Sequence, residues 1–235
     1  MQPLIIVHRA SLNEINGIEV DGNWHSAGIV KDTRSSAEIR TRLPLDLSLS
    51  WVTLKDNENL EPHFHPIESY VAILKNCAFF HGDKLIPLET GDVVCIPSNM
   101  LHSFSKGPID SPFWGIAWNT TLGHLFQGNL NDRLVFFKNE QKCQSIIPAS
   151  KINLFRDSST SLAGLKINGF QLQPQKEILI GPTPKSWLII AESCFSDELR
   201  NNQFAEGDLV LIDNNKVVLK NTSEMTKYFY IFSVI

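Results

Sequence analysis

The chain has 235 residues, of which 43% are hydrophobic and 20% are charged, enough for one large or two small domains with hydrophobic cores. Its formal net charge is −4, and no block of lysine or arginine is present, which argues against nucleic acid or an acidic membrane surface as a partner. No stretch approaches the ~18 apolar residues of a membrane span, and the N-terminus does not resemble a signal peptide, so we expect a cytoplasmic protein.

Strand patterns dominate the chain from residue 47 onward. Leu47, Leu49 and Trp51 alternate with Ser48 and Ser50, which is the period-two pattern of a half-buried strand. Turn-forming residues separate the runs, which favours an all-β architecture with short strands. The further predicted strands are Tyr70 to Leu74, Val93 to Ile96, Phe113 to Trp118, Leu188 to Ala191, Leu209 to Ile212 and Tyr228 to Ile235.

An internal repeat divides the chain into two similar halves. The sequence ESYVAILKNC, residues 68–77, aligns with KSWLIIAESC, residues 185–194, and GDVVCIPSN, residues 91–99, aligns with GDLVLIDNN, residues 207–215. We therefore predict two copies of one domain over residues 1–125 and 151–235. A partly helical connector, beginning near Thr121, is expected to join them over residues 126–150.

The first copy contains a group of residues typical of a metal site: His63, His65, Glu68 and His102. His63 and His65 are two apart, so on a strand their side chains leave the same face. Several imidazoles beside a carboxylate are ligands for a divalent transition metal.

At these positions the chain resembles the cupin superfamily, whose motifs are G-x5-H-x-H-x3,4-E-x6-G and G-x5-P-x-G-x2-H-x3-N. The second motif is matched by Gly91, Pro97 and His102, with Asn99 in the glycine position, where a left-handed residue is needed. The resemblance implies two cupin-type antiparallel β-barrels (double-stranded β-helix or jelly roll). The first barrel would hold a metal through His63, His65, Glu68 and His102.

Glu68 departs from the family pattern, because only two residues separate it from His65. An odd separation turns its side chain to the other face of a strand unless a bulge at Pro66 restores it. If it is not restored, we expect a three-histidine site, with Glu68 acting behind the ligands or as a base. The loss of the carboxylate would leave a more positive metal, suited to an anionic substrate.

The second copy lacks these ligands. The alignment places Ile180, Pro182, Lys185 and Val218 at the positions of the four metal-binding candidates. The sequence also contains no histidine after His124, so we expect the metal site in the first copy and a degenerate second copy.

Residues near the histidines supply candidates for catalysis and for the substrate pocket. Glu68 and Tyr70 share a face and are candidate proton carriers. The candidate pocket residues are Trp51, Tyr70, Phe104, Trp118 and Arg42, the last as a partner for a substrate carboxylate. Core packing for the aromatic residues and solvent exposure for the arginine are the competing interpretations.

Three functions fit this pattern. The favoured one is a non-haem Fe(II) dioxygenase, an oxidoreductase acting on a small organic substrate. The second is a redox-neutral isomerase, cyclase, lyase or decarboxylase that uses a metal such as Zn, Mn or Ni as a Lewis acid. The third is a metal-containing ligand-binding module without enzymatic activity, in which the metal only organises the ligand pocket. The fold itself does not decide among these functions. The resemblance also implies a homodimer, because exposed barrel faces often pair in cupins.

Overall fold

The computed structural model describes residues 3–20, 22–43, 47–54, 60–108, 112–120, 136–137, 147–157, 160–162 and 164–235. Within them the strands pair antiparallel throughout, and the all-β prediction is confirmed. The helical elements described are α1 (Ala37–Arg40) and the 3-10 turns η1 (Arg9–Ser11) and η2 (Thr33–Ser35). In this part of the chain no helix has the length and apolar character needed to cross a membrane.

The chain forms two compact units, which are described separately. Unit 1 consists of Met1–Leu12, Ser36–Leu43 and Leu154–Ile235, and unit 2 of Asn13–Ser35 and Pro44–Asn153. The predicted division was linear along the sequence, whereas the N-terminal residues group with the C-terminal half. Most of the predicted connector lies outside the described residues, and its described part includes the two-residue strand β12 (Phe136–Phe137).

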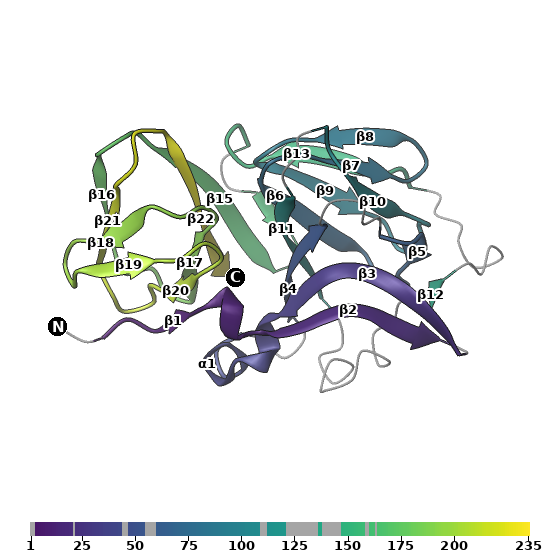
Figure 1. The fold of residues 1–235 in the computed structure, drawn as a ribbon, viewed down its shortest axis with the longest axis horizontal. Coiled ribbons are helices and arrows are strands. Elements are labelled where there is room, and N and C mark those ends of the chain that lie inside the picture. Colours follow the sequence, from purple (N-terminus) through teal and green to yellow (C-terminus); the bar gives the residue numbers. More distant parts are fainter. Residues whose placement is uncertain are drawn as a thin grey trace. The chain divides into compact units, whose positions relative to one another are not determined.

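Unit 2 contains a large sheet, a small sheet and a two-stranded pair (Figure 1). The large sheet has the order β13 (Ser150–Asn153), β9 (Asp92–Ile96), β6 (Ser69–Lys75), β11 (Phe113–Thr120), β4 (Leu47–Leu54), β3 (Asn23–Asp32) and β2 (Asn13–Val20). The small sheet has the order β10 (Ser103–Lys106), β7 (Ala78–His81) and β8 (Leu85–Leu88), and β12 (Phe136–Phe137) pairs with β5 (His63–Phe64).

The core of unit 2 fixes which face of each strand points inward. Val71 and Ile73 on β6 belong to one buried cluster with Phe80 and Phe104 of the small sheet. Because side chains alternate along a strand, Tyr70 and Ala72 point to the opposite face of the large sheet. That face is also buried along β6, which explains why this strand reads as a continuous apolar run.

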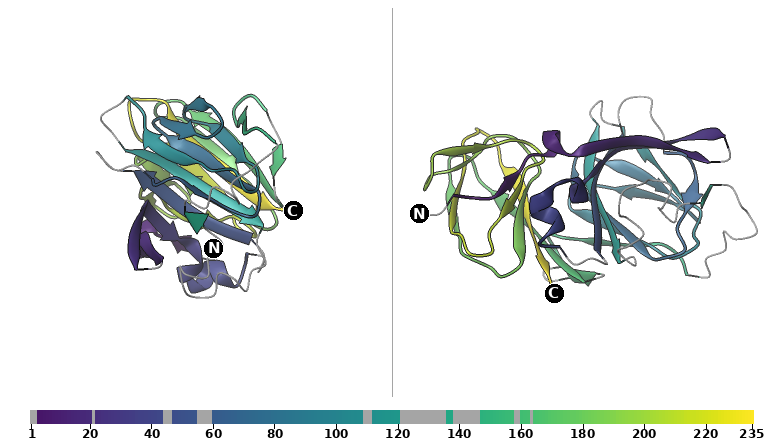
Figure 2. Two further views of the ribbon diagram at one scale, coloured as in Figure 1. Left: turned by 90° about the vertical axis from the view of Figure 1, so that its right-hand side faces the viewer. Right: turned by 90° about the horizontal axis from the view of Figure 1, so that it is seen from below.

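The β2–β3 hairpin has no counterpart in the predicted elements. Its two strands run side by side along a curved path in Figure 1, and Figure 2 shows them from two other sides. Their register shifts between Ile15 and Gly17, so the period-two alternation that identifies a strand is interrupted. Gly28 has φ +63 and lies against Leu54, a conformation and a close approach that favour glycine.

Unit 1 repeats the arrangement with two sheets. The larger has the order β1 (Ile6–Val7), β20 (Leu209–Leu211), β17 (Ser186–Ile190), β22 (Lys227–Val234), β15 (Leu165–Leu172) and β14 (Thr160–Leu162). The smaller has the order β16 (Glu177–Ile180), β21 (Val217–Asn221), β18 (Phe195–Asp197) and β19 (Asn202–Phe204).

The predicted repeat is present in the sheet topology. The order β9-β6-β11-β4 in unit 2 matches β20-β17-β22-β15 in unit 1, so the aligned segments occupy equivalent strands. The two Gly-Asp turns also match, since Gly91 and Gly207 have φ 91 and 89. Their amides donate to the carbonyl oxygens of Ile73 and Ile190 at the same distance, 2.7 Å.

The aspartates of these turns bind the edge strand next to them. Asp92 accepts hydrogen bonds from Lys151 and Asn153 of β13, at 3.1 and 2.9 Å. In unit 1 the equivalent Asp208 is bonded to His8, at 2.9 Å, directly after β1. The edge next to β20 is therefore completed by the N-terminal segment.

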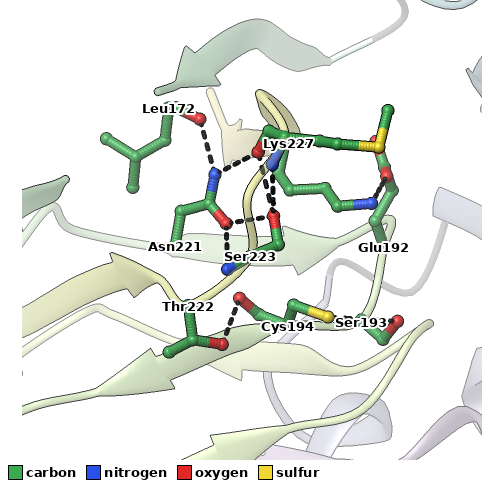
Figure 3. Close-up of polar contacts among 9 residues, drawn as sticks. Leu172, Glu192, Ser193, Cys194, Asn221, Thr222, Ser223 and Lys227 are labelled. Atoms are coloured by element: carbon green, nitrogen blue, oxygen red, sulfur yellow. Dashed lines mark hydrogen bonds and ion pairs between the residues drawn. The ribbon is translucent and has the colours of Figure 1, made fainter. Parts of the chain in front are cut away.

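Asn221 organises one end of unit 1, as Figure 3 shows. Its side-chain amide donates to the carbonyl oxygens of Leu172 and Met225, at 2.9 and 2.7 Å. Its side-chain oxygen accepts from the backbone amide and the hydroxyl of Ser223. The residue is fully buried, and these bonds attach the end of β15 to the turn over residues 221–225.

Candidate metal centre

Three predicted metal ligands converge in unit 2. His63, His65 and His102 each offer a ring nitrogen, and these nitrogens lie within 4.8 Å of one another. The ring centroids of His63 and His102 are 4.4 Å apart, and His65 lies 5.0 and 5.3 Å from these two rings. The spacing suits three ligands of one metal ion.

Backbone hydrogen bonds hold the two histidine-bearing segments together. The amide of His63 donates to the carbonyl oxygen of His102 at 2.9 Å, and the reverse bond is 2.8 Å long. The amide of Asn99 donates to the carbonyl oxygen of His65 at 2.6 Å, and Asn99 has φ 59. The expectation that Asn99 provides a left-handed turn residue is confirmed.

The tautomers of His63 and His102 are set by two backbone carbonyl groups. Nδ1 of His63 lies 2.8 Å from the oxygen of Glu61, and Nδ1 of His102 lies 2.9 Å from the oxygen of Met100. A carbonyl oxygen only accepts, so each Nδ1 carries the proton. The Nε2 atoms are then unprotonated, which is the form that binds a metal.

Burial keeps these imidazoles uncharged. It lowers the pKa of His63 to about 4, although the hydrogen bond to Glu61 opposes the shift. Burial also lowers the pKa of His102 well below its ordinary value, and the charges that His63 and His65 would carry lower it further. Both side chains are neutral near pH 7, as metal ligands must be.

His25 and Glu61 support the His63 segment, and sequence reasoning did not identify this pair. The carboxylate of Glu61 accepts hydrogen bonds from Nδ1 of His25 at 3.0 Å and from the amide of Ser26 at 3.2 Å. These contacts attach Glu61 to β3. Glu61 is also the residue whose carbonyl oxygen orients the ring of His63. The pairing is long-range in sequence, so no local pattern marks it.

Aromatic side chains of the core pack beside His102. Phe104 was predicted as an apolar wall, and its ring centroid lies 6.2 Å from that of His102. Phe80, which was not predicted, stacks on the same imidazole at 5.8 Å. The apolar surroundings explain the lowered pKa.

Glu68 and Tyr70 point away from this group. Tyr70 lies on the opposite face of the large sheet from the core cluster, and its hydroxyl donates to the carboxylate of Glu68. Tyr70 also stacks on Trp118 at 5.4 Å, and Trp51 lies on this face of β4. The structure therefore does not bring these four predicted site residues to the histidines, and a ligand role for Glu68 stays a prediction.

Arg42 lies in unit 1, just after α1, and not in the unit that carries the histidines. It is exposed, and its guanidinium donates to the carbonyl oxygen of Glu38 at 2.9 Å and to the hydroxyl of Thr41 at 3.1 Å. These local bonds give it a role at the end of the helix.

No family model and no curated protein matches the chain. The solved structures that it resembles include vicilin from Capsicum annuum, with 9% identity, a TM-score of 0.59, and coverage of 97% of this chain and 85% of that chain. They also include an oxalate decarboxylase mutant from Bacillus subtilis, with 10% identity, a TM-score of 0.50 and coverage of 97% and 76%. Salicylate 1,2-dioxygenase from Pseudoaminobacter salicylatoxidans has 9% identity and a TM-score of 0.52, with coverage of 87% of this chain and 73% of that chain. These proteins are cupins.

The chain has the cupin fold. The likeness covers 97% of the chain, so it extends over both units. Identities near 10% establish the fold and leave the function to be argued from the site.

Unit 1 has apolar side chains at the position that is equivalent to the histidine group. His63 bridges His102 in unit 2, and Ile180 pairs with Val217 in unit 1, where both are buried in the core. The alignment of the two halves had placed Val218 at the position equivalent to His102. The strand register instead makes Val217 the inward residue, while Val218 is only partly buried.

Proposed function

We propose that the protein is a metal-dependent cupin enzyme, in which His63, His65 and His102 bind one divalent transition metal. Fe(II) is favoured over Zn, Mn and Ni, and the proposed reaction is dioxygenation of a small organic substrate. The observation that carries the proposal is the convergence of three imidazoles, two of which are neutral and have Nδ1 bonded to a carbonyl oxygen.

The donor set fits a transition metal. Neutral imidazole nitrogen suits Fe, Zn, Cu and Ni, and three protein ligands leave positions for water or substrate. Bound Fe(II) would supply the ability to activate dioxygen. The chain itself orients the imidazoles through Glu61 and Met100, and Phe80 and Phe104 exclude water from one side of His102.

Two alternatives remain as proposals with less support. The redox-neutral alternative requires Glu68 or Tyr70 to carry a proton. It has less support because both side chains point away from the histidines. A non-enzymatic binding role is favoured by one observation, the similarity to vicilins, which are non-enzymatic storage globulins. The TM-score for the Capsicum annuum vicilin is 0.59.

Elemental analysis of protein purified without added metal tests the site. We expect about one metal ion per chain, lost in His102→Ala. The matched control is His81→Ala, since His81 is exposed and bonds to Ser105 at 2.6 Å, outside the group. Retention of the metal in His102→Ala would show that the site is assigned to the wrong residues.

The identity of the metal then separates the functions. Iron together with oxygen uptake on a candidate substrate supports the dioxygenase. Zinc, manganese or nickel with turnover under anaerobic conditions supports the redox-neutral alternative. A folded protein that binds a ligand without any metal, even after reconstitution, supports the binding module.

A further inference from the structure

Three buried polar atoms of the large sheet have no hydrogen-bond partner among the described residues: Nε1 of Trp51, on the face of Tyr70, and two side-chain oxygens. The two oxygens are Oγ of Ser69 and Oδ1 of Asn119. Ser69 is only 6% exposed. A buried polar atom without a partner costs about 1–3 kcal/mol, so such atoms need an explanation.

Both oxygens belong to side chains that face the interior of unit 2. Ser69 precedes Val71 by two residues on β6, and Asn119 follows Ala117 by two residues on β11, and both hydrophobic residues pack in the core cluster. Alternation along each strand therefore places Ser69 and Asn119 on the face that the cluster covers.

The two side chains are neighbours across adjacent strands. Tyr70 pairs with Trp118, so the next step in the antiparallel register brings Ser69 opposite Asn119. Directly opposed side chains have Cβ atoms about 4.5–5.5 Å apart, close enough for both to contact one small group. The same cluster contains Phe80 and Phe104, which pack on His102.

We propose that Ser69 and Asn119 form a polar subsite that binds a hydroxyl group of a small anionic ligand held at the histidine centre. This inference rests on the proposed metal site. A hydroxyl group both donates and accepts, so it satisfies the amide oxygen of Asn119 and the hydroxyl of Ser69 together. The anionic end follows from charge, because three neutral imidazoles leave the charge of a divalent metal uncompensated while Glu68 bonds to Tyr70.

The first test measures thermal stability of the metal-free protein. Ser69→Ala removes a hydroxyl that has no bond to lose, so we expect the melting temperature to stay unchanged or rise. The matched control is Thr53→Val, which removes a hydroxyl that donates to the carbonyl oxygen of Phe113 at 2.6 Å and lies on the other face of the sheet. This control should melt at a lower temperature.

The second test measures binding of glycolate and acetate, which differ by one hydroxyl group, to zinc-loaded protein by calorimetry. We expect glycolate to bind about tenfold more tightly than acetate, the effect of one or two hydrogen bonds. Ser69→Ala and Asn119→Ala should each reduce this preference and leave acetate binding unchanged, whereas Thr53→Val should keep it.

The outcomes separate this inference from the proposed function. Failure to bind zinc contradicts the proposed function, and the stability comparison still tests the subsite because it involves no metal. If zinc binds but glycolate has no advantage over acetate, or if the advantage survives Asn119→Ala, the subsite does not exist. A Ser69→Ala protein that melts as low as Thr53→Val would assign the serine hydroxyl a structural role.

Discussion

A difference of one residue determines which side chain at the start of β6 faces the core of unit 2. The odd separation between His65 and Glu68 carries the acid to the face of Tyr70 and leaves Ser69 facing inward. The sequence predicts this parity, but it does not show whether a bulge at Pro66 would reverse it, because a bulge depends on contacts with distant strands. The histidines themselves were predictable, since their spacing is local.

The arrangement of Glu68 leads to a prediction for metal content. Glu68→Gln keeps a hydrogen-bond acceptor for Tyr70 and removes the charge, so we expect the metal stoichiometry to remain unchanged. Elemental analysis beside His102→Ala checks this. Loss of the metal in Glu68→Gln would show that the carboxylate is a fourth ligand.

The lowered pKa of His63 makes the stability of the metal-free protein depend on pH. Its pKa is about 4 in the folded protein and 6.5 when unfolded, so between these values the unfolded state binds more protons. The free energy of unfolding therefore falls on acidification, by about 2 kcal/mol from pH 7 to pH 5 for this group. Chemical denaturation at both pH values checks the decrease, which should be smaller in His63→Leu.

At the level of elements, strands were predictable where the sequence has a continuous apolar run or alternates between apolar and polar residues. The apolar run of β6 and the alternation of β4 are examples. The β2–β3 hairpin was not predictable, because the register shift after Ile15 breaks its pattern. The sequence also did not predict whether Trp51 and Trp118 point toward the histidines, because a tryptophan side chain is common both in a core and in a ligand site.

Asn221 shows how much one buried side chain contributes to an element. Asn221→Ala would leave the carbonyl oxygens of Leu172 and Met225 without these donors, and we expect a loss of roughly 3 kcal/mol in the free energy of unfolding. Asn214→Ala, at an exposed position with one local bond to Asp213, is the control and should change stability by less than about 0.5 kcal/mol. Equal effects of the two substitutions would contradict the structural role of Asn221.

In the whole molecule, one domain plan is used twice with different interiors. The repeat was predictable from the aligned segments, and the same strand order is present in both units. The membership of each unit was not, because β1 pairs with β20 and so joins residues that are distant in the sequence. A pairing of two residues leaves too short a pattern to predict.

Removal of β1 tests its contribution to unit 1. Deletion of residues 1–8 removes the pairing with β20 and the bond between His8 and Asp208, and it exposes a strand edge. We expect the free energy of unfolding to fall by roughly 2–3 kcal/mol. Deletion of residues 1–3, which ends before β1, is the control and should have little effect on a denaturation curve.

The position of β1 also orders events during synthesis on the ribosome. Ile6 and Val7 leave the ribosome early, but their partners Val210 and Leu209 follow some two hundred residues later. Unit 2 is complete once residue 153 has emerged, so it can fold while the N-terminal strand waits unpaired. Unit 1 closes last, and slow closure of this long-range pairing sets the time for which an unpaired strand is open to aggregation or chaperone binding.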